Sequence, residues 1–90
     1  MSMDSISINK RCIDNIKYYR LKNGITQAKM AETLDVTEKH YCHLENMKYQ
    51  LTIKNLEIIS HVLNKEPWEL LKEKHTKDDI AFLNHKSRRA

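Results

Sequence analysis

The sequence predicts an all-α fold of five or six helices. Apolar residues recur at steps of three and four along most of the chain, which is the spacing of one helix face, and no stretch has the alternation of a β-strand. Only one glycine and one proline interrupt the 90 residues. With 40% hydrophobic residues, a chain of this length is expected to form one small domain around a single core.

The first two predicted helices are separated by a short turn. Residues 8–20 form the first helix, whose apolar stripe is Ile8, Cys12, Ile16 and Tyr19. Asn23 and Gly24 follow, and both tolerate the left-handed backbone angles found just after a helix. Thr26 can cap the second helix. Its inward residues are expected to be Met30, Ala31 and Leu34.

The third and fourth predicted helices each follow a threonine. After a turn at Asp35, Thr37 can cap a short helix that turns Tyr41 and Leu44, three apart, toward the core. Thr52 precedes a fourth helix that ends near Asn64. The apolar stripe of this helix is Ile53, Leu56, Ile59 and Leu63.

The C-terminal part predicts two further helices. Pro67 suits the first turn of a fifth helix. The bulky residues expected to join the core there are Trp68, Leu70 and Leu71. A sixth helix is expected after the cap candidate Thr76, because acids come early and bases late, as the helix dipole favours. Its residues Ile80, Phe82 and Leu83 would close the core or join a dimer contact.

Composition and charge narrow the class of protein. No stretch reaches the roughly 18 to 20 apolar residues of a membrane span, and the N-terminus lacks a signal-like apolar run, so a cytoplasmic protein is expected. Cys12 and Cys42 lack a close-spaced framework, which favours free thiols over a disulfide. Residues 72–90 carry +3 of the net charge of +4. Residues 1–71 would therefore have to bind a polyanion through local placement of charge.

The stretch TQAKMAETLDVTEKHYCHLEN, residues 26–46, places two short helices across one tight turn. Helices this short are marginal alone, so each must be held by packing against its neighbours. A crossing of this kind needs a small residue, a turn residue and apolar contacts. Ala31 and Asp35 fill the first two roles. The apolar contacts are expected from Met30, Leu34, Val36, Tyr41 and Leu44.

This stretch resembles the helix-turn-helix of the phage-repressor and Cro superfamily, also called Xre-type regulators. The likeness extends over about residues 13–71. RLKNGITQ at 20–27 is similar to the opening of the family's motif, and LEN at 44–46 to a common end of its recognition helix. PWELL at 67–71 is similar to the usual start of its fifth helix.

The resemblance implies a lambda-repressor-like DNA-binding domain and its boundaries. The domain would cover residues 1–71, with its core at 9–71 and the helix-turn-helix at 26–46. Residues 72–90 would form a basic extension that is helical in part. The implied function is that of a transcriptional regulator, a repressor, that binds double-stranded DNA as a homodimer on paired half-sites. The sequence does not indicate a small-molecule or peptide effector.

The resemblance also implies which residues contact DNA. The helix at 37–46 would enter the major groove, with Gln27 on the DNA backbone. Base-reading candidates are Glu38, Lys39, His40 and His43, because lysine can donate to guanine, histidine can donate or accept, and glutamate can accept from cytosine N4. Phosphate-contact candidates are Thr37, Asn46 and Lys48. Arg20 and Glu45 match a buried structural ion pair of similar proteins.

The sequence departs from the family pattern at several positions. Asp35 and Met47 stand where glycine is common, and Tyr41 is bulkier than the usual aliphatic residue. Glu38 places an acid at the end that should face DNA, where it repels phosphates unless it reads cytosine. Together with the near-neutral residues 1–71, Glu38 supports an alternative, a protein-interaction module of antitoxin or antirepressor type with the same fold.

Metal and catalytic sites are less well supported. His40, Cys42 and His43 are near one another in sequence, but zinc sites need three or four convergent ligands, so no metal is expected. Glu57 and His61 lie four apart on one helix face and could be considered as an acid-base couple, but ordinary surface residues of a helix are more often arranged in this way. The sequence has neither a nucleophile-elbow motif nor a glycine-rich phosphate-binding loop. We therefore expect no catalytic residues, no cofactor and no enzymatic activity.

Overall fold

The computed structural model describes residues 7–72, 75 and 77–87. These residues form six α-helices and no strand, which confirms the predicted all-α fold. The helices are α1 (Ile8–Lys22), α2 (Gln27–Leu34), α3 (Glu38–Glu45), α4 (Ile53–Leu63), α5 (Pro67–Lys72) and α6 (Lys77–Ser87). None of them, over the part of the chain described, could serve as a bilayer-crossing segment.

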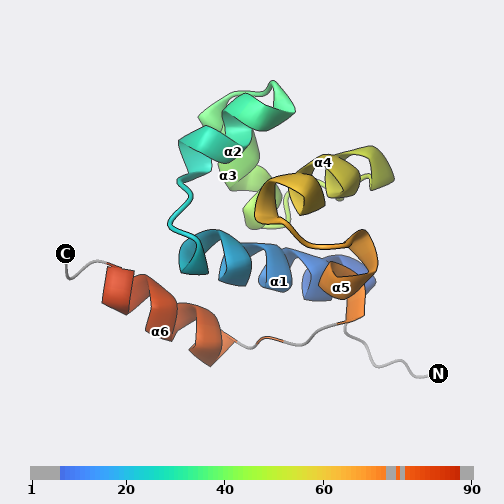
Figure 1. Ribbon diagram of the computed structural model, residues 1–90. Coiled ribbons are helices and arrows are strands. Elements are labelled where there is room, and N and C mark those ends of the chain that lie inside the picture. Colours follow the sequence, from blue (N-terminus) through green and yellow to red (C-terminus); the bar gives the residue numbers. More distant parts are fainter. Residues whose placement is uncertain (1–6, 73–74, 76, 88–90) are drawn as a thin grey trace.

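Helix α1 is the central element of the fold. It contacts α3, α4, α5 and α6, while α2 packs against α3 and α4. Figure 1 shows α2, α3 and α4 on one side of α1 and α6 along the opposite side. The helix-turn-helix pair therefore lies away from the C-terminal helix.

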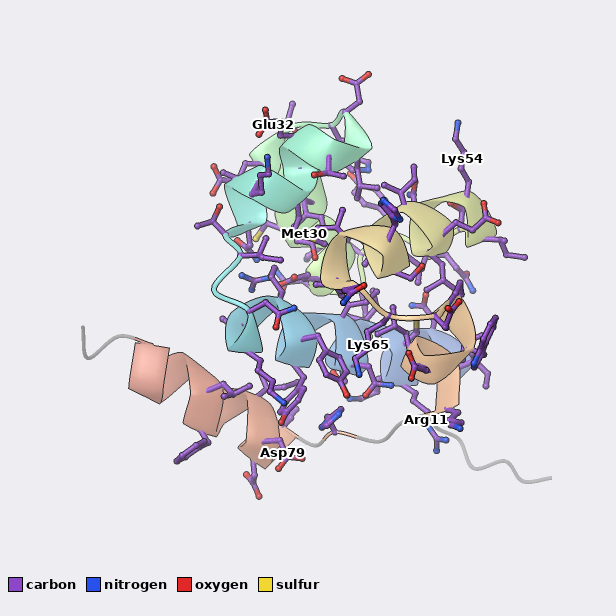
Figure 2. The ribbon with its side chains drawn as sticks, viewed as in Figure 1. Arg11, Met30, Glu32, Lys54, Lys65 and Asp79 are labelled. Carbon is purple, nitrogen blue, oxygen red and sulfur yellow. The ribbon has the colours of Figure 1, made fainter. Side chains whose placement is uncertain are left out.

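The core is built from apolar side chains of α1 to α5. Its buried members are Cys12, Ile13, Ile16, Tyr19, Met30, Ala31, Tyr41, Leu44, Leu56, Ile59, Leu63 and Leu70. Met30 points inward from α2, whereas Glu32 and Lys54 project into solvent (Figure 2). Leu34 and Val36 are partly buried against this core. The apolar contacts predicted for the helix-turn-helix crossing are thus confirmed.

Both cysteines are free thiols, as the sequence indicated. Cys12 is buried in the core, and its burial raises the pKa of the thiol to about 11. Cys42 lies on α3 and is partly exposed. Since the thiolate is the reactive form, the raised pKa and the burial of Cys12 both disfavour its reaction at neutral pH.

Some apolar residues expected in the core are exposed. The prediction for Trp68 was wrong, because its side chain is 60% exposed. Helix α5 turns Leu70 inward, and Trp68, two positions earlier, lies near the opposite face of the helix. Ile53, the first residue of α4, is 79% exposed, and Ile8, the first residue of α1, is also exposed. The helical stripes therefore begin one turn later than their apolar residues suggested.

Helices α1 to α4 start with the same hydrogen bond. The hydroxyl of the cap residue accepts from the backbone N–H three residues later, at 3.0 to 3.1 Å. The caps are Ser7, Thr26, Thr37 and Thr52, so the caps predicted at Thr26 and Thr37 are confirmed, and Thr52, which was predicted to precede the fourth helix, also caps it. The candidate cap Thr76 and the basic residues Lys74, Arg88 and Arg89 lie outside the described residues.

The same helices end alike, with a residue in the left-handed conformation. These residues are Gly24, Asp35, Met47 and Asn64, with φ between 59° and 70°. At each end the next N–H donates to a carbonyl five residues earlier, as in Lys48 N to His43 O at 2.9 Å. Aspartate and asparagine enter this conformation with modest strain, whereas methionine has no such tolerance. Met47 is therefore the strained position among them.

Replacing Met47 with glycine is expected to stabilise the protein. Relief of the left-handed strain contributes about 1 to 2 kcal/mol, and the added freedom of the unfolded chain offsets about 0.5 to 1 kcal/mol. The side chain is 39% exposed, so little packing is lost. Urea unfolding should show a higher midpoint for Met47→Gly. Asn64→Gly, at an equivalent helix end, should give a smaller gain, and an equal or lower midpoint for Met47→Gly would contradict this interpretation.

Candidate nucleic-acid interface

Helix α3 has one face in the core and one in solvent. Tyr41 and Leu44 are buried and hold α3 against the rest of the domain. In the first turn, the base-reading candidates Glu38, Lys39 and His40 are exposed. His43, one turn further on, is partly exposed. The structure therefore brings all of these candidates to the accessible side of one helix.

The phosphate-contact candidates surround both ends of α3. The Thr37 hydroxyl accepts from His40 N–H at 3.0 Å, and its own proton can still be donated to a phosphate oxygen. Asn46 is exposed, and its amide donates to Cys42 Sγ at 3.6 Å. Lys48 is exposed in the following loop. These side chains flank the base-reading candidates along the helix.

Gln27 lies apart from the other phosphate candidates. It is partly buried at the start of α2, and its Nε2 donates to Glu45 Oε1 at 3.0 Å. The structure thus places Gln27 in contact with the ion pair as well as at the helix start that the resemblance assigns to the DNA backbone. This contact depends on how α2 crosses α3 and had no signal in the sequence.

Arg20 and Glu45 form a buried ion pair between α1 and the end of α3. Arg20 Nε lies 2.6 Å from Glu45 Oε2, and Nη2 lies 3.1 Å from Oε1. Arg20 Nη1 also donates to Ile25 O at 3.0 Å, which secures the α1–α2 loop. The side chain of Glu45 is 2% exposed and that of Arg20 11%. The pair fixes the position of α3 relative to the scaffold.

Tyr41 completes the surroundings of the Glu45 carboxylate. Its hydroxyl donates to Glu45 Oε2 at 2.6 Å. Burial, reinforced by the nearby Glu45 carboxylate, raises the pKa of Tyr41 far above its usual value, so the phenol remains a neutral donor. This explains the bulk at a position where the family usually has an aliphatic residue. The hydroxyl supplies a hydrogen bond that an aliphatic side chain could not.

Tyr49, in the loop after α3, contacts His40 and lies near His43. Its ring stacks on the imidazole of His40, with centroids 4.6 Å apart and planes 16° apart. The ring of His43 lies 6.0 Å away and is tilted by 51°. From its place in the loop after the third helix, the sequence indicated that Tyr49 could approach the DNA backbone, but it did not predict the stacking on His40. That contact requires the chain to reverse after Met47, which the sequence does not show.

The local charge on the exposed face of α3 is mixed. Lys39 and Lys48 are cationic, while Glu38 is the acid of the first helical turn. An acid at this position interacts favourably with the helix dipole, which gives Glu38 a structural role whether or not it contacts a base. The N-terminal end of α3 itself adds partial positive charge toward an approaching phosphate.

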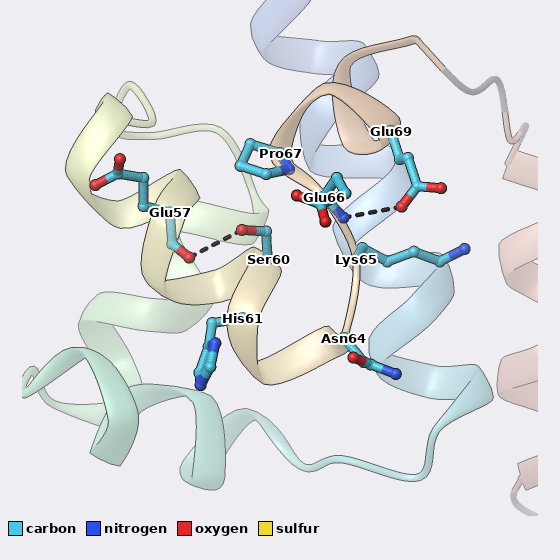
Figure 3. A pocket seen from close by; sticks show the side chains of 8 residues that line it. All are labelled: Glu57, Ser60, His61, Asn64, Lys65, Glu66, Pro67 and Glu69. Carbon is cyan, nitrogen blue, oxygen red and sulfur yellow. Dashed lines mark hydrogen bonds between the residues drawn. The ribbon is translucent and has the colours of Figure 1, made fainter.

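A pocket elsewhere on the domain contains the residues considered for acid-base chemistry. It has a volume of about 490 Å³ and lies between α4 and the start of α5 (Figure 3). Glu57 and His61 line it, but their side chains point in different directions (Figure 3). Over the described ranges, no group of three or more His, Cys, Asp or Glu residues is arranged to hold a metal ion.

Comparison with known proteins assigns the chain to a family by one match. The family model described as helix-turn-helix matches residues 16–70. No curated protein and no solved structure gives a significant match. The matched span contains α2, α3 and α4 in full, together with every candidate contact on and around α3.

Proposed function

This chain belongs to the Cro/C1-type, Xre-like helix-turn-helix family of DNA-binding regulators, and on that premise we propose that it is a sequence-specific transcriptional repressor. In this proposal α3 enters the major groove of double-stranded DNA. Residues 1–71 act as the DNA-binding domain and residues 72–90 as a basic extension.

The observation that carries the proposal is the division of α3 into two faces. Tyr41 and Leu44 anchor the helix in the core, which leaves the first turn free to contact a partner. Lys39 would donate to guanine O6 and N7, and Glu38 would accept from cytosine N4. His40 and His43 would donate to or accept from base edges. Phosphates would be bound by Gln27, Thr37, Asn46 and Lys48.

A titration of mixed-sequence duplex DNA at two salt concentrations tests this proposal. Fluorescence anisotropy should show binding at low salt that weakens steeply at higher salt, because binding a polyanion releases counterions. No binding at low salt would refute the DNA-binding proposal. It would favour the alternative, a protein-interaction module of antitoxin or antirepressor type, for which the exposed Glu38 is the supporting feature.

We further propose that the protein binds paired half-sites as a homodimer, spaced by about one helical turn, or roughly 34 Å. The exposed ring of Trp68 on α5 supports a contact there, because large aromatic residues dominate the energetics of protein interfaces.

Replacing Trp68 with alanine is therefore expected to weaken dimer formation at least tenfold, the size of effect typical of a central aromatic contact. Sedimentation equilibrium would measure the dissociation constant. Tyr49→Ala removes another exposed aromatic residue and should leave it unchanged. An unaltered dimer in Trp68→Ala, or a wild-type monomer on DNA, would exclude this contact.

A further inference from the structure

We propose that Tyr49 is a positioning residue for sequence recognition, and that its ring orients the His40 imidazole toward a base edge. This inference rests on the proposed DNA-binding function and extends it to a residue outside α3. Tyr49 is assigned no base contact of its own. It acts through His40.

The geometry of the ring pair carries the inference. The rings of His40 and Tyr49 are nearly parallel, with 4.6 Å between centroids. The terminal torsion of an exposed histidine is broad, so the ring of such a residue has no fixed orientation by itself. Stacking restricts the plane of the imidazole. Because both ring nitrogens lie in that plane, they face sideways from the stack, where a base edge can meet them.

The loop that carries Tyr49 is fastened on both sides. Before it, the left-handed Met47 turns the chain back, and Lys48 N donates to His43 O at 2.9 Å. After it, Leu51 N donates to the side-chain carbonyl of Asn9 on α1 at 3.0 Å. Tyr49 is therefore held over α3 by hydrogen bonds to two helices. A ring on such a loop can serve as a fixed support.

A purely structural role explains the stack less well. Tyr49 is 44% exposed and His40 is exposed, and neither belongs to the core. Substitutions at exposed positions outside the core usually change the stability of a domain little. His43 lies near the same ring, one turn from His40, so the support faces the same side of α3 as the base-reading candidates. The remaining role for the stack is to orient the His40 side chain for recognition.

The experiment compares Tyr49→Ala and Tyr49→Phe, each in the wild type and in His40→Ala. Affinity is measured for a duplex recovered by selection from a random pool and for a random-sequence duplex. Tyr49→Ala should weaken binding to the selected duplex about two- to tenfold, the effect of one aromatic pair, and leave random-sequence binding unchanged. Tyr49→Phe keeps the ring and should bind like the wild type. In His40→Ala, the further change Tyr49→Ala should have no effect.

Other results would overturn the inference in distinguishable ways. If Tyr49→Phe weakens both duplexes as Tyr49→Ala does, the hydroxyl binds phosphate and the ring does not position His40. If the loss in Tyr49→Ala persists in His40→Ala, the two residues act independently. If the wild-type protein binds no duplex at low salt, the proposed function and this inference are both refuted. If the wild type binds DNA but the variants give either of the two results above, only the inference is refuted.

Discussion

Replacing Glu45 with alanine is expected to lower the free energy of unfolding by about 3 to 5 kcal/mol. The change leaves the largely buried Arg20 guanidinium without its carboxylate, and it removes the acceptor of the Tyr41 hydroxyl and the Gln27 amide. Buried donors without acceptors retain the full cost of desolvation. Thermal and urea unfolding of wild type and variant would measure the loss.

An exposed ion pair on α2 provides the matched control for Glu45. Lys29 Nζ lies 3.7 Å from Glu32 Oε1, and both side chains are largely in solvent. Glu32→Ala should therefore change the free energy of unfolding by at most about 0.5 kcal/mol. Tyr41→Phe, which removes one donor and keeps the ion pair, should have an intermediate effect. An unchanged melting temperature for Glu45→Ala would remove the ion pair from the account of how α3 is held.

Replacing Lys39 with alanine is expected to weaken binding to a selected duplex by about 1 to 3 kcal/mol, or roughly five- to 150-fold in Kd. Lys39 is exposed in the first turn of α3, so its replacement would remove the proposed contact to DNA without disturbing the core. If Lys39 reads guanine, the variant should also discriminate less well at one base pair. Anisotropy titrations at fixed salt would measure both quantities.

Lys77 is the matched control for Lys39. It is also exposed, and it begins α6, which packs against α1 and, over the described residues, makes no contact with α3. Lys77→Ala removes the same charge and should leave Kd nearly unchanged. Equal losses in the two variants would mean that general charge, not the first turn of α3, determines affinity. No loss in Lys39→Ala would exclude Lys39 from the interface.

Local sequence signals were sufficient for most of the fold. Threonine before each helix-turn-helix element fixed the starts of α2 and α3, because a cap hydrogen bond involves only residues three apart. The apolar spacing identified Met30 and Tyr41 as core residues for the same reason. Trp68 could not be placed in this way. On a six-residue helix, spacing does not determine which of several apolar residues faces inward.

The site was less accessible to sequence reasoning, because its contacts depend on how the helices cross. Gln27 reaches Glu45 only because the start of α2 lies beside the end of α3. Tyr49 reaches His40 only because Met47 adopts a left-handed conformation, which its residue type disfavours. Periodicity and caps describe single elements. Periodicity and cap residues therefore do not predict contacts between different helices and loops.

We propose that the exposed first turn of α3 is the surface that contacts DNA. A titration of ¹⁵N-labelled protein with duplex DNA at low salt, followed by NMR, would locate the contact surface. The largest amide shifts should fall in residues 37–43 and at Lys48 and Tyr49, with α6 little affected. Shifts confined to α5 and α6, with those of α3 unchanged, would contradict it.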